Sequence, residues 1–113
     1  MPRFVTNADY EEKDAHPLSL VAGDEVTVGP VDRAWPGWVW VVDGEGRRGY
    51  VPEAAMEPLG EGRFAMMEDF DSTVLKVSRG DSVESIRIVH GWHWCRHADG
   101  GEGWVTDYLL SPV

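Results

Sequence analysis

The sequence predicts an all-β protein of two tandem, small, five-stranded antiparallel barrels packed side by side, mainly because it contains an internal duplication. A stretch that begins Gly-Trp-x-Trp and ends Gly-aromatic-Val occurs at residues 37–51 and again at residues 91–105, with a glycine-containing turn inside each copy. A Leu-x-apolar-x-x-Gly-Asp segment precedes each copy, at residues 18–24 and 75–81. No segment has helical periodicity over a window of about 11 residues, so the repeated unit consists of short strands.

The duplication divides the 113 residues near their middle. We predict barrel 1 over residues 1–59 and barrel 2 over residues 60–113, with residues 60–63 as a linker. Fully extended, such a linker spans about 14 Å, so the two barrels should have little freedom relative to each other. Domains of this size bury only about 60% of their unfolded surface, so each barrel would gain stability from packing against the other.

In the first repeat, the predicted strands are short runs of β-branched or aromatic residues bounded by turn residues. They lie at residues 4–6, 26–31, 38–42, 47–51 and 56–59. Residues 9–17 form an acidic loop that ends at a proline, and residues 32–37 form a second loop. Pro30 indicates that the second strand stops there or lies at a sheet edge. Residues 52–55 are predicted as one turn of 3₁₀ helix.

The second repeat has the same order of elements. Its predicted strands lie at residues 64–66, 83–89, 92–97, 103–105 and 109–110. Its first and second loops are shorter than those of the first repeat. It is therefore a divergent copy.

Charge and composition exclude several classes of function. The net charge of −10 disfavours nucleic acid and favours partners that carry Lys or Arg, although acidic residues also simply increase solubility. The single cysteine excludes an intrachain disulfide framework. The N-terminus lacks a signal-peptide pattern and no run is long enough to span a bilayer. We therefore expect a cytoplasmic protein with no membrane partner, unless the chain is a piece of a longer one.

The order of these motifs resembles two tandem Src-homology-3 (SH3) domains of the bacterial variant type. The first repeat has Asp9-Tyr10, Leu18-Ser19-Leu20, Gly23-Asp24, Trp38 and Gly49-Tyr50-Val51-Pro52. The second repeat has Asp69-Phe70, Leu75-Lys76-Val77, Gly80-Asp81, Trp92 and Gly103-Trp104-Val105. The resemblance covers nearly the whole chain.

The resemblance implies binding of proline-rich peptides in an aromatic groove, where acidic residues select a basic residue of the ligand. The first repeat keeps Tyr10, Trp38 and Pro52 of that groove but has Ala8 and Ala55 in place of two tyrosines. The second repeat keeps Phe70 and Trp92 but has Glu68, Thr106 and Leu109 at the corresponding groove positions.

We predict a ligand-binding surface on barrel 1 that combines an apolar platform with an acidic anchor for a basic residue. The platform residues are Tyr10, Trp35, Trp38 and Pro52, and the anchor residues are Glu11, Glu12 and Asp14. In this hypothesis the Trp38 ring lies on the outside of the barrel. Trp38→Ala should then abolish binding and leave the thermal midpoint nearly unchanged.

The two Trp-x-Trp pairs should each present both indoles on one face of a strand. By the resemblance, Val41 and Cys95 then lie in the two cores, while Trp40 and Trp94 lie on outward faces. Phe70, Trp92 and Trp94 are candidates for a second surface or for the contact between the barrels.

His93, Cys95 and His97 alternate along one strand and could chelate zinc or copper. The other interpretation places Cys95 in the core, where a free cysteine behaves as a small apolar residue, and both histidines at partly exposed positions. The sequence has no pattern of a nucleophile with a histidine base and no phosphate-binding loop. We therefore expect no enzymatic activity and no cofactor.

Together these patterns predict a non-catalytic adaptor that binds a protein or peptide with a basic or proline-containing segment. Two alternatives remain open: a cell-wall or peptidoglycan-binding module, and an accessory subunit of an enzyme complex.

Overall fold

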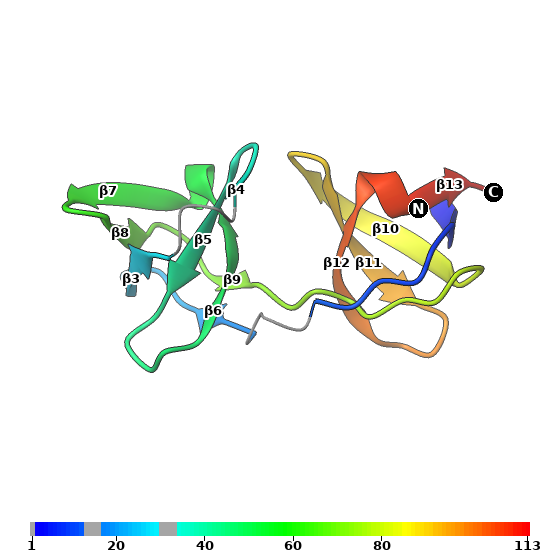
Figure 1. Cartoon of the computed structure of the whole chain (residues 1–113), viewed down its shortest axis with the longest axis horizontal. Helices are drawn as coiled ribbons and strands as arrows, with labels where there is room; N and C mark the ends of the chain where they lie inside the picture. The colour runs from blue at the N-terminus through cyan, green and yellow to red at the C-terminus, as the bar shows by residue number, and fades with distance from the viewer. Residues whose placement is uncertain (1, 13–16, 30–33) are drawn as a thin grey trace. The chain divides into compact units, whose positions relative to one another are not determined.

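A computed structural model describes residues 2–12, 17–29 and 34–113. Within this part of the chain all regular structure is strand apart from two short 3₁₀ turns, which confirms the all-β prediction (Figure 1). Among the described residues, no helix has the length and apolar character needed to cross a membrane.

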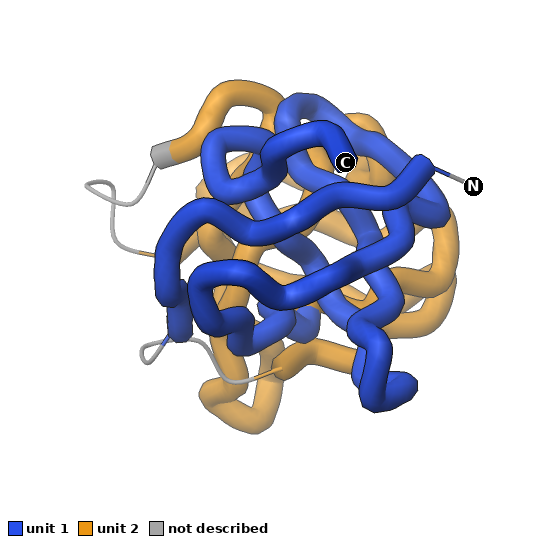
Figure 2. Tube along the Cα trace, turned by 90° about the vertical axis from the view of Figure 1, so that its right-hand side faces the viewer, with its two compact units in different colours: residues 1–13, 73–113 blue, residues 14–72 orange. Residues whose placement is uncertain are grey.

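The chain forms two compact units, shown in two colours in Figure 2. Unit 1 consists of residues 1–13 and 73–113, and unit 2 consists of residues 14–72. The boundary predicted between residues 59 and 60 does not coincide with this division. The first strand of the first repeat lies in unit 1, together with most of the second repeat. The first strand of the second repeat lies in unit 2, together with most of the first repeat.

Unit 1 is built on one antiparallel sheet of strand order β12-β11-β10-β1-β13. Its strands are β1 (Arg3–Thr6), β10 (Ser82–Val89), β11 (Trp92–His97), β12 (Glu102–Thr106) and β13 (Leu110–Pro112). The 3₁₀ turn η2 (Asp107–Leu109) precedes β13. The core contains Val77, Val83, Cys95 and Val105, against which Phe4 and Tyr10 pack from the first repeat.

Unit 2 has a related arrangement with additional short strands, and β8 of the second repeat lies among strands of the first. One sheet has the order β4-β5-β3-β8-β7 with β6 paired to β5, and β2 pairs with β9. The elements are β2 (Ser19–Leu20), β3 (Glu25–Val28), β4 (Ala34–Trp35), β5 (Trp38–Val42), β6 (Arg48–Pro52), η1 (Glu53–Ala55), β7 (Met56–Gly60), β8 (Arg63–Met66) and β9 (Phe70–Asp71). The 3₁₀ turn predicted near residues 52–55 is confirmed by η1.

The two units are completed in equivalent ways by strands from opposite repeats. In unit 1, β1 lies between β10 and β13, and Phe4 is opposite Pro112. In unit 2, β8 lies between β3 and β7, and Phe64 is opposite Pro58. The chain thus exchanges its two first strands, and each strand occupies the same position in the other repeat's sheet.

The predicted linker at residues 60–63 is instead the tight connection of a hairpin between β7 and β8. Its three residues have positive φ angles, of 92° at Gly60, 57° at Glu61 and 75° at Gly62. Glycine adopts this conformation at low cost, and two of the three residues are glycines. A connection this short leaves β8 beside β7 in unit 2. The place next to β13 in unit 1 is then filled by β1.

The Gly-Asp turn of each repeat holds the end of the exchanged strand. In unit 1 the Gly80 N–H donates to the Thr6 carbonyl at 2.7 Å, and the Thr6 N–H donates to the Asp81 carbonyl at 2.9 Å. In unit 2 the Gly23 N–H donates to the Met66 carbonyl at 2.7 Å, and the Met66 N–H donates to the Asp24 carbonyl at 2.8 Å. The two junctions are therefore built from matching backbone hydrogen bonds.

Candidate protein-binding site

The structure divides the predicted ligand-binding residues between the two units. Tyr10, Glu11 and Glu12 belong to unit 1, whereas Trp35, Trp38 and Pro52 belong to unit 2. Asp14 lies outside the described residues.

Unit 2 brings Trp35, Trp38 and Pro52 together. Trp38 on β5 lies opposite Pro52 on β6 and opposite Trp35 on β4. Its ring also meets the Phe70 ring edge-on, with the ring centroids 6.0 Å apart. Phe70 thus occupies the place beside Trp38 that the sequence analysis gave to Tyr10. The signal that could have identified it is the alignment of Asp69-Phe70 with Asp9-Tyr10.

The expectation that Trp38 lies on the outside is wrong. Only 6% of this residue is exposed, and Pro52 and Phe70 beside it are buried as well. Trp35 is half-buried, so it is the residue of this cluster with accessible aromatic surface.

Of the four core and surface assignments made from the Trp-x-Trp pairs, three agree with the structure. Val41 and Cys95 are fully buried in their units, and Trp94 is half-buried. The assignment of Trp40 to an outward face is wrong, because it is 2% exposed and its ring packs against Tyr50 at 4.9 Å. Trp40 also covers Gly29, where an added Cβ would lie 2.5 Å from the indole Cδ1.

The candidates for a second surface have different environments. Phe70 is buried in unit 2, and Trp92 is buried in unit 1. Trp94 packs on Trp104 at 5.3 Å, and its Nε1–H donates to Glu102 Oε1 at 2.9 Å. The Trp94 contacts explain its partial burial within unit 1.

Several groups of the first acidic segment have partners within unit 1. The Tyr10 backbone exchanges two hydrogen bonds with Val77, of 2.9 and 3.0 Å. The Arg79 N–H donates to Asp9 Oδ1 at 2.8 Å, and Lys76 Nζ lies 3.5 Å from Glu11 Oε2. These contacts fix the segment against the second repeat.

His93 is buried, contrary to the prediction of partial exposure. Its Nδ1 is hydrogen-bonded to Ser85 Oγ at 2.7 Å, its Nε2 lies 3.1 Å from Asp107 Oδ1, and the Phe4 ring packs edge-on against it. The combination of Ser, His and Asp suggests a hydrolytic triad, but Ser85 is only 4% exposed on β10. The network therefore satisfies buried polar groups and links β10, β11 and η2.

His97 is half-buried, as predicted, and lies between two carboxylates. Its Nε2 is 3.0 Å from Asp81 Oδ2, and its Nδ1 is 3.1 Å from Asp99 Oδ1. The hydrogen bond to Asp81, followed by the charge of Asp99, holds the pKa of His97 above its ordinary value. The pKa of Asp81 is lowered, mainly by the hydrogen bond from the Ser78 N–H and then by His97.

The metal alternative for His93, Cys95 and His97 is not supported by their arrangement. Burial raises the pKa of the Cys95 thiol to about 11, which disfavours the thiolate that a metal would need. Each histidine uses both ring nitrogens in the contacts above. Among the described residues, no group of three His, Cys, Asp or Glu side chains is placed to hold a metal ion.

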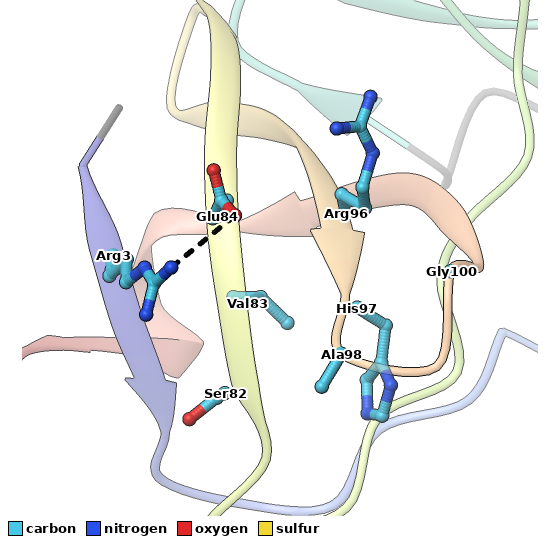
Figure 3. Close-up of a pocket in the computed structure, with 8 residues that line it drawn as sticks. All are labelled: Arg3, Ser82, Val83, Glu84, Arg96, His97, Ala98 and Gly100. Atoms are coloured by element: carbon cyan, nitrogen blue, oxygen red, sulfur yellow. Dashed lines mark ion pairs between the residues drawn. The ribbon is translucent and has the colours of Figure 1, made fainter.

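Unit 1 also has a pocket of about 330 Å³ on its sheet (Figure 3). The residues that line it are Arg3, Ser82, Val83, Glu84, Arg96, His97, Ala98 and Gly100. Arg3 Nη2 lies 3.9 Å from Glu84 Oε1, while Arg96 pairs with Glu102 at 3.1 Å. Both signs of charge are therefore present, and of the predicted site residues only His97 lies here.

The fold and the aromatic cluster define the class of this protein. Small antiparallel units with a Gly-Asp turn, a buried Trp at the start of a hairpin and a 3₁₀ turn before the last strand are small β-barrel domains. The chain belongs to the variant SH3 domain family, whose model matches residues 3–59. SH3 domains are protein–protein interaction modules and are generally non-catalytic.

A curated relative is SH3 and PX domain-containing protein 2B of Mus musculus, which is 24% identical over 98% of this chain. The chain spans 14% of the length of that protein. No solved structure matches the chain. The family match covers the first repeat in sequence order, although β1 of that repeat is part of unit 1 in space.

Proposed function

We propose that this chain is a non-catalytic adaptor that binds a partner protein through a basic, proline-containing segment. The observation that carries this proposal is the aromatic and proline cluster of unit 2 in a chain with a net charge of −10. Exposed carboxylates occur close to this cluster in the sequence, since Glu53 follows Pro52 and Glu68 precedes Phe70 by two residues.

The physical basis is a division of roles between rings and charges. A polyproline II segment is already extended, so it loses little entropy when it docks on flat rings. The half-buried Trp35 provides the accessible ring and lies opposite Trp38 in the β4–β5 pair. Trp38 in turn lies opposite Pro52 and packs against Phe70. Exposed carboxylates attract the basic residues and fix the orientation of the segment.

Titration of the purified chain with synthetic peptides tests this proposal. The probe is a proline-containing peptide with two arginines, and the control is the same peptide with both arginines replaced by glutamate. We expect the basic peptide to bind with an affinity that falls as salt is added, since salt screens exposed charges over about 10 Å at 0.1 M. Equal binding of both peptides, or of neither, would contradict the proposal.

Trp35→Ala in the full chain is the matched variant. It should weaken peptide binding while the thermal midpoint changes little, because Trp35 is half-buried on the short strand β4. Trp38→Ala is unsuitable for this purpose, because its burial couples binding to stability.

An accessory subunit of an enzyme complex is the second candidate, and a different surface favours it. In unit 1, Ile86 and Ile88 on β10 are 38% and 63% exposed, and Tyr108 is 80% exposed. A contiguous exposed apolar patch is typical of a protein contact, and these three residues are the candidates for one in unit 1. Ile88→Asp would release a permanent partner in a pull-down but would leave peptide binding at unit 2 unchanged.

A further inference from the structure

We infer that the pocket of unit 1 binds a small zwitterion, a molecule with one ammonium group and one carboxylate, through Glu84 and the two arginines that flank it, Arg3 and Arg96. All three residues line the pocket and belong to unit 1, whereas the aromatic cluster proposed for peptide binding belongs to unit 2. The inference therefore goes beyond the proposed function and does not depend on it.

The charges of the pocket form an alternating row across three strands. Glu84 on β10 lies opposite Arg3 on β1 and opposite Arg96 on β11. Directly opposed residues of an antiparallel pair share one face of the sheet, so the row has the order positive, negative, positive. Neighbouring strands are about 4.8 Å apart, which sets the spacing of the opposite charges. A simple anion would be repelled by Glu84 and a simple cation by the arginines, while a zwitterion fits both signs.

The ion pair between Arg3 and Glu84 is open enough to admit a ligand. Arg3 Nη2 lies 3.9 Å from Glu84 Oε1 (Figure 3), which is longer than a hydrogen bond. The side chains of Arg3 and Glu84 are 73% and 33% exposed. An ammonium group can therefore approach the Glu84 carboxylate without breaking a hydrogen bond to Arg3.

Arg96 is held in place by its neighbour on β12. Its Nε–H donates to Glu102 Oε2 at 3.1 Å, and Glu102 Oε1 accepts the Trp94 Nε1–H at 2.9 Å. The hydrogen bonds from Trp94 and then from Arg96 lower the pKa of Glu102, so this carboxylate stays charged. A guanidinium has four N–H donors besides Nε–H, and they suit the carboxylate of a ligand.

The remaining walls of the pocket are small or form contacts of their own. Ser82, Ala98 and Gly100 have short side chains or none, and His97 contacts two carboxylates through its ring nitrogens. A volume of about 330 Å³ is at the lower end of the range for small-molecule sites. The pocket therefore suits a ligand of few atoms.

Unit 2 has a pocket of about 120 Å³ at the corresponding place. It is lined by Arg63 at the start of the exchanged strand β8, by residues 25–27 of β3 and by residues 42–44. Arg63 Nη2 donates to Glu25 Oε1 at 2.9 Å, so this cation and carboxylate are joined by a hydrogen bond. The same position in the fold is thus hollow in both units, but the ion pair is closed in the smaller pocket.

The two pockets also differ in the residues of the central row. Alignment of the Gly-Asp turns and of the Trp-x-Trp pairs makes Thr27 the counterpart of Glu84, and Val42 the counterpart of Arg96. Thr27 lies opposite Arg63 and opposite Val42, so this row carries only the charge of Arg63. The pocket of unit 2 is therefore an internal control for the alternating charges of unit 1.

The pocket is separate from the aromatic end of the hairpin in unit 1. Trp92 begins β11 and lies opposite Thr106, whereas Arg96 comes four residues later on the same strand. Four residues of a strand span about 13 Å. A zwitterion in the pocket should therefore leave the surroundings of Trp92 unchanged.

NMR titration of the full chain, labelled with ¹⁵N, tests the inference. The probe is 4-aminobutanoate, and the controls are butanoate and butylammonium, each of which carries one of its two charges. We expect binding in the millimolar range, because exposed ion pairs are weak, with amide shifts at residues 82–84 and 96–100. Each control should bind at least about tenfold more weakly. Equal binding of either control, or no binding of the probe, would overturn the inference.

Substitutions then test the assigned residues. E84Q and R96Q should each weaken binding of 4-aminobutanoate by at least about tenfold, because each removes one charge of the row. E25Q, in the pocket of unit 2, is the matched control and should leave binding unchanged. The same spectra show whether each variant is folded, and the comparison of the three probes needs no substitution. A loss in E25Q as large as in E84Q would overturn the assignment to unit 1.

Discussion

The Phe70 ring packs edge-on against the Trp38 ring with 6.0 Å between centroids, although the two residues belong to different repeats. Both are 6% exposed, so each ring covers part of the other. This pair shows that the hydrophobic interior of unit 2 depends on both halves of the sequence.

Trp38→Ala should therefore destabilise the protein, in contrast to the small effect expected if the ring were exposed. Removing a buried Trp side chain costs about 3–5 kcal/mol through lost burial and the cavity left behind. Urea unfolding followed by circular dichroism measures the loss. Trp35→Ala, at a half-buried position, is the control and should cost clearly less. Equal losses for the two variants would contradict the packing described.

Gly49→Ala should destabilise unit 2 because the new methyl group has no space. Its Cβ would be 2.8 Å from Ser72 Oγ and 3.3 Å from Ser72 Cβ, and Ser72 is buried and hydrogen-bonded. Overpacking of this kind costs about 1–3 kcal/mol. Gly44→Ala is the control, because nothing lies within 4 Å of the added Cβ there. If Gly49→Ala had the same thermal midpoint as Gly44→Ala, Ser72 would not be packed against Gly49 of β6.

The contiguous segment of residues 14–72 should fold alone, whereas residues 1–59 should not. Residues 14–72 contain every strand of unit 2, including β8 and β9. Residues 1–59 lack both, so Val26 would lose its partner Phe64 and Trp38 would lose Phe70. Amide dispersion in NMR spectra and cooperative thermal unfolding distinguish the two. A well-folded 1–59 with an unfolded 14–72 would show that the repeats do not exchange their first strands.

Stability should fall as the pH rises through the pKa of His97 in the folded protein. The pKa of His97 is raised above its ordinary value of 6.5 by Asp81 and Asp99. Between the pKa of His97 in the unfolded chain and its higher pKa in the folded protein, the folded state binds more protons than the unfolded state. The stabilisation by protonated His97 is therefore fully present below pH 6.5 and is lost as the pH rises through the folded-state pKa. The free energy of unfolding across this range, together with an NMR titration of the His97 ring, measures the effect.

His97→Gln is the control for that measurement, since glutamine can hydrogen-bond but does not titrate. The variant should lose the decline of stability above neutral pH. Asp81 and Asp99 have lowered pKa values, so their contribution has the opposite sign and is lost only as the solution becomes strongly acidic. An unchanged pH profile in His97→Gln would show that other groups cause the decline.

The local elements could be predicted because each has a local cause. Alternating β-branched and aromatic residues produced the strands around Trp38 and Trp92, and glycine-containing turns closed their hairpins. The family resemblance, combined with this alternation, placed Val41 and Cys95 in the cores, where both are fully buried. It put Trp40 on the same strand face as Trp38 but wrongly assigned Trp40 to the outside, because the sequence could not show that the Tyr50 ring packs against it and that Gly29 lies beneath it.

The sequence by itself determined that the chain is all-β, since strand periodicity and turn residues are local properties, and the order of its motifs pointed to the SH3 family through a resemblance. It could not determine which first strand completes which unit, because Phe4 and Phe64 are equivalent and either could occupy either sheet. The tertiary structure decided this through the hairpin at Gly60-Glu61-Gly62, which is too short to let β8 leave β7. That connection places Phe70 beside Trp38, and the aromatic cluster of unit 2 therefore combines residues of both repeats.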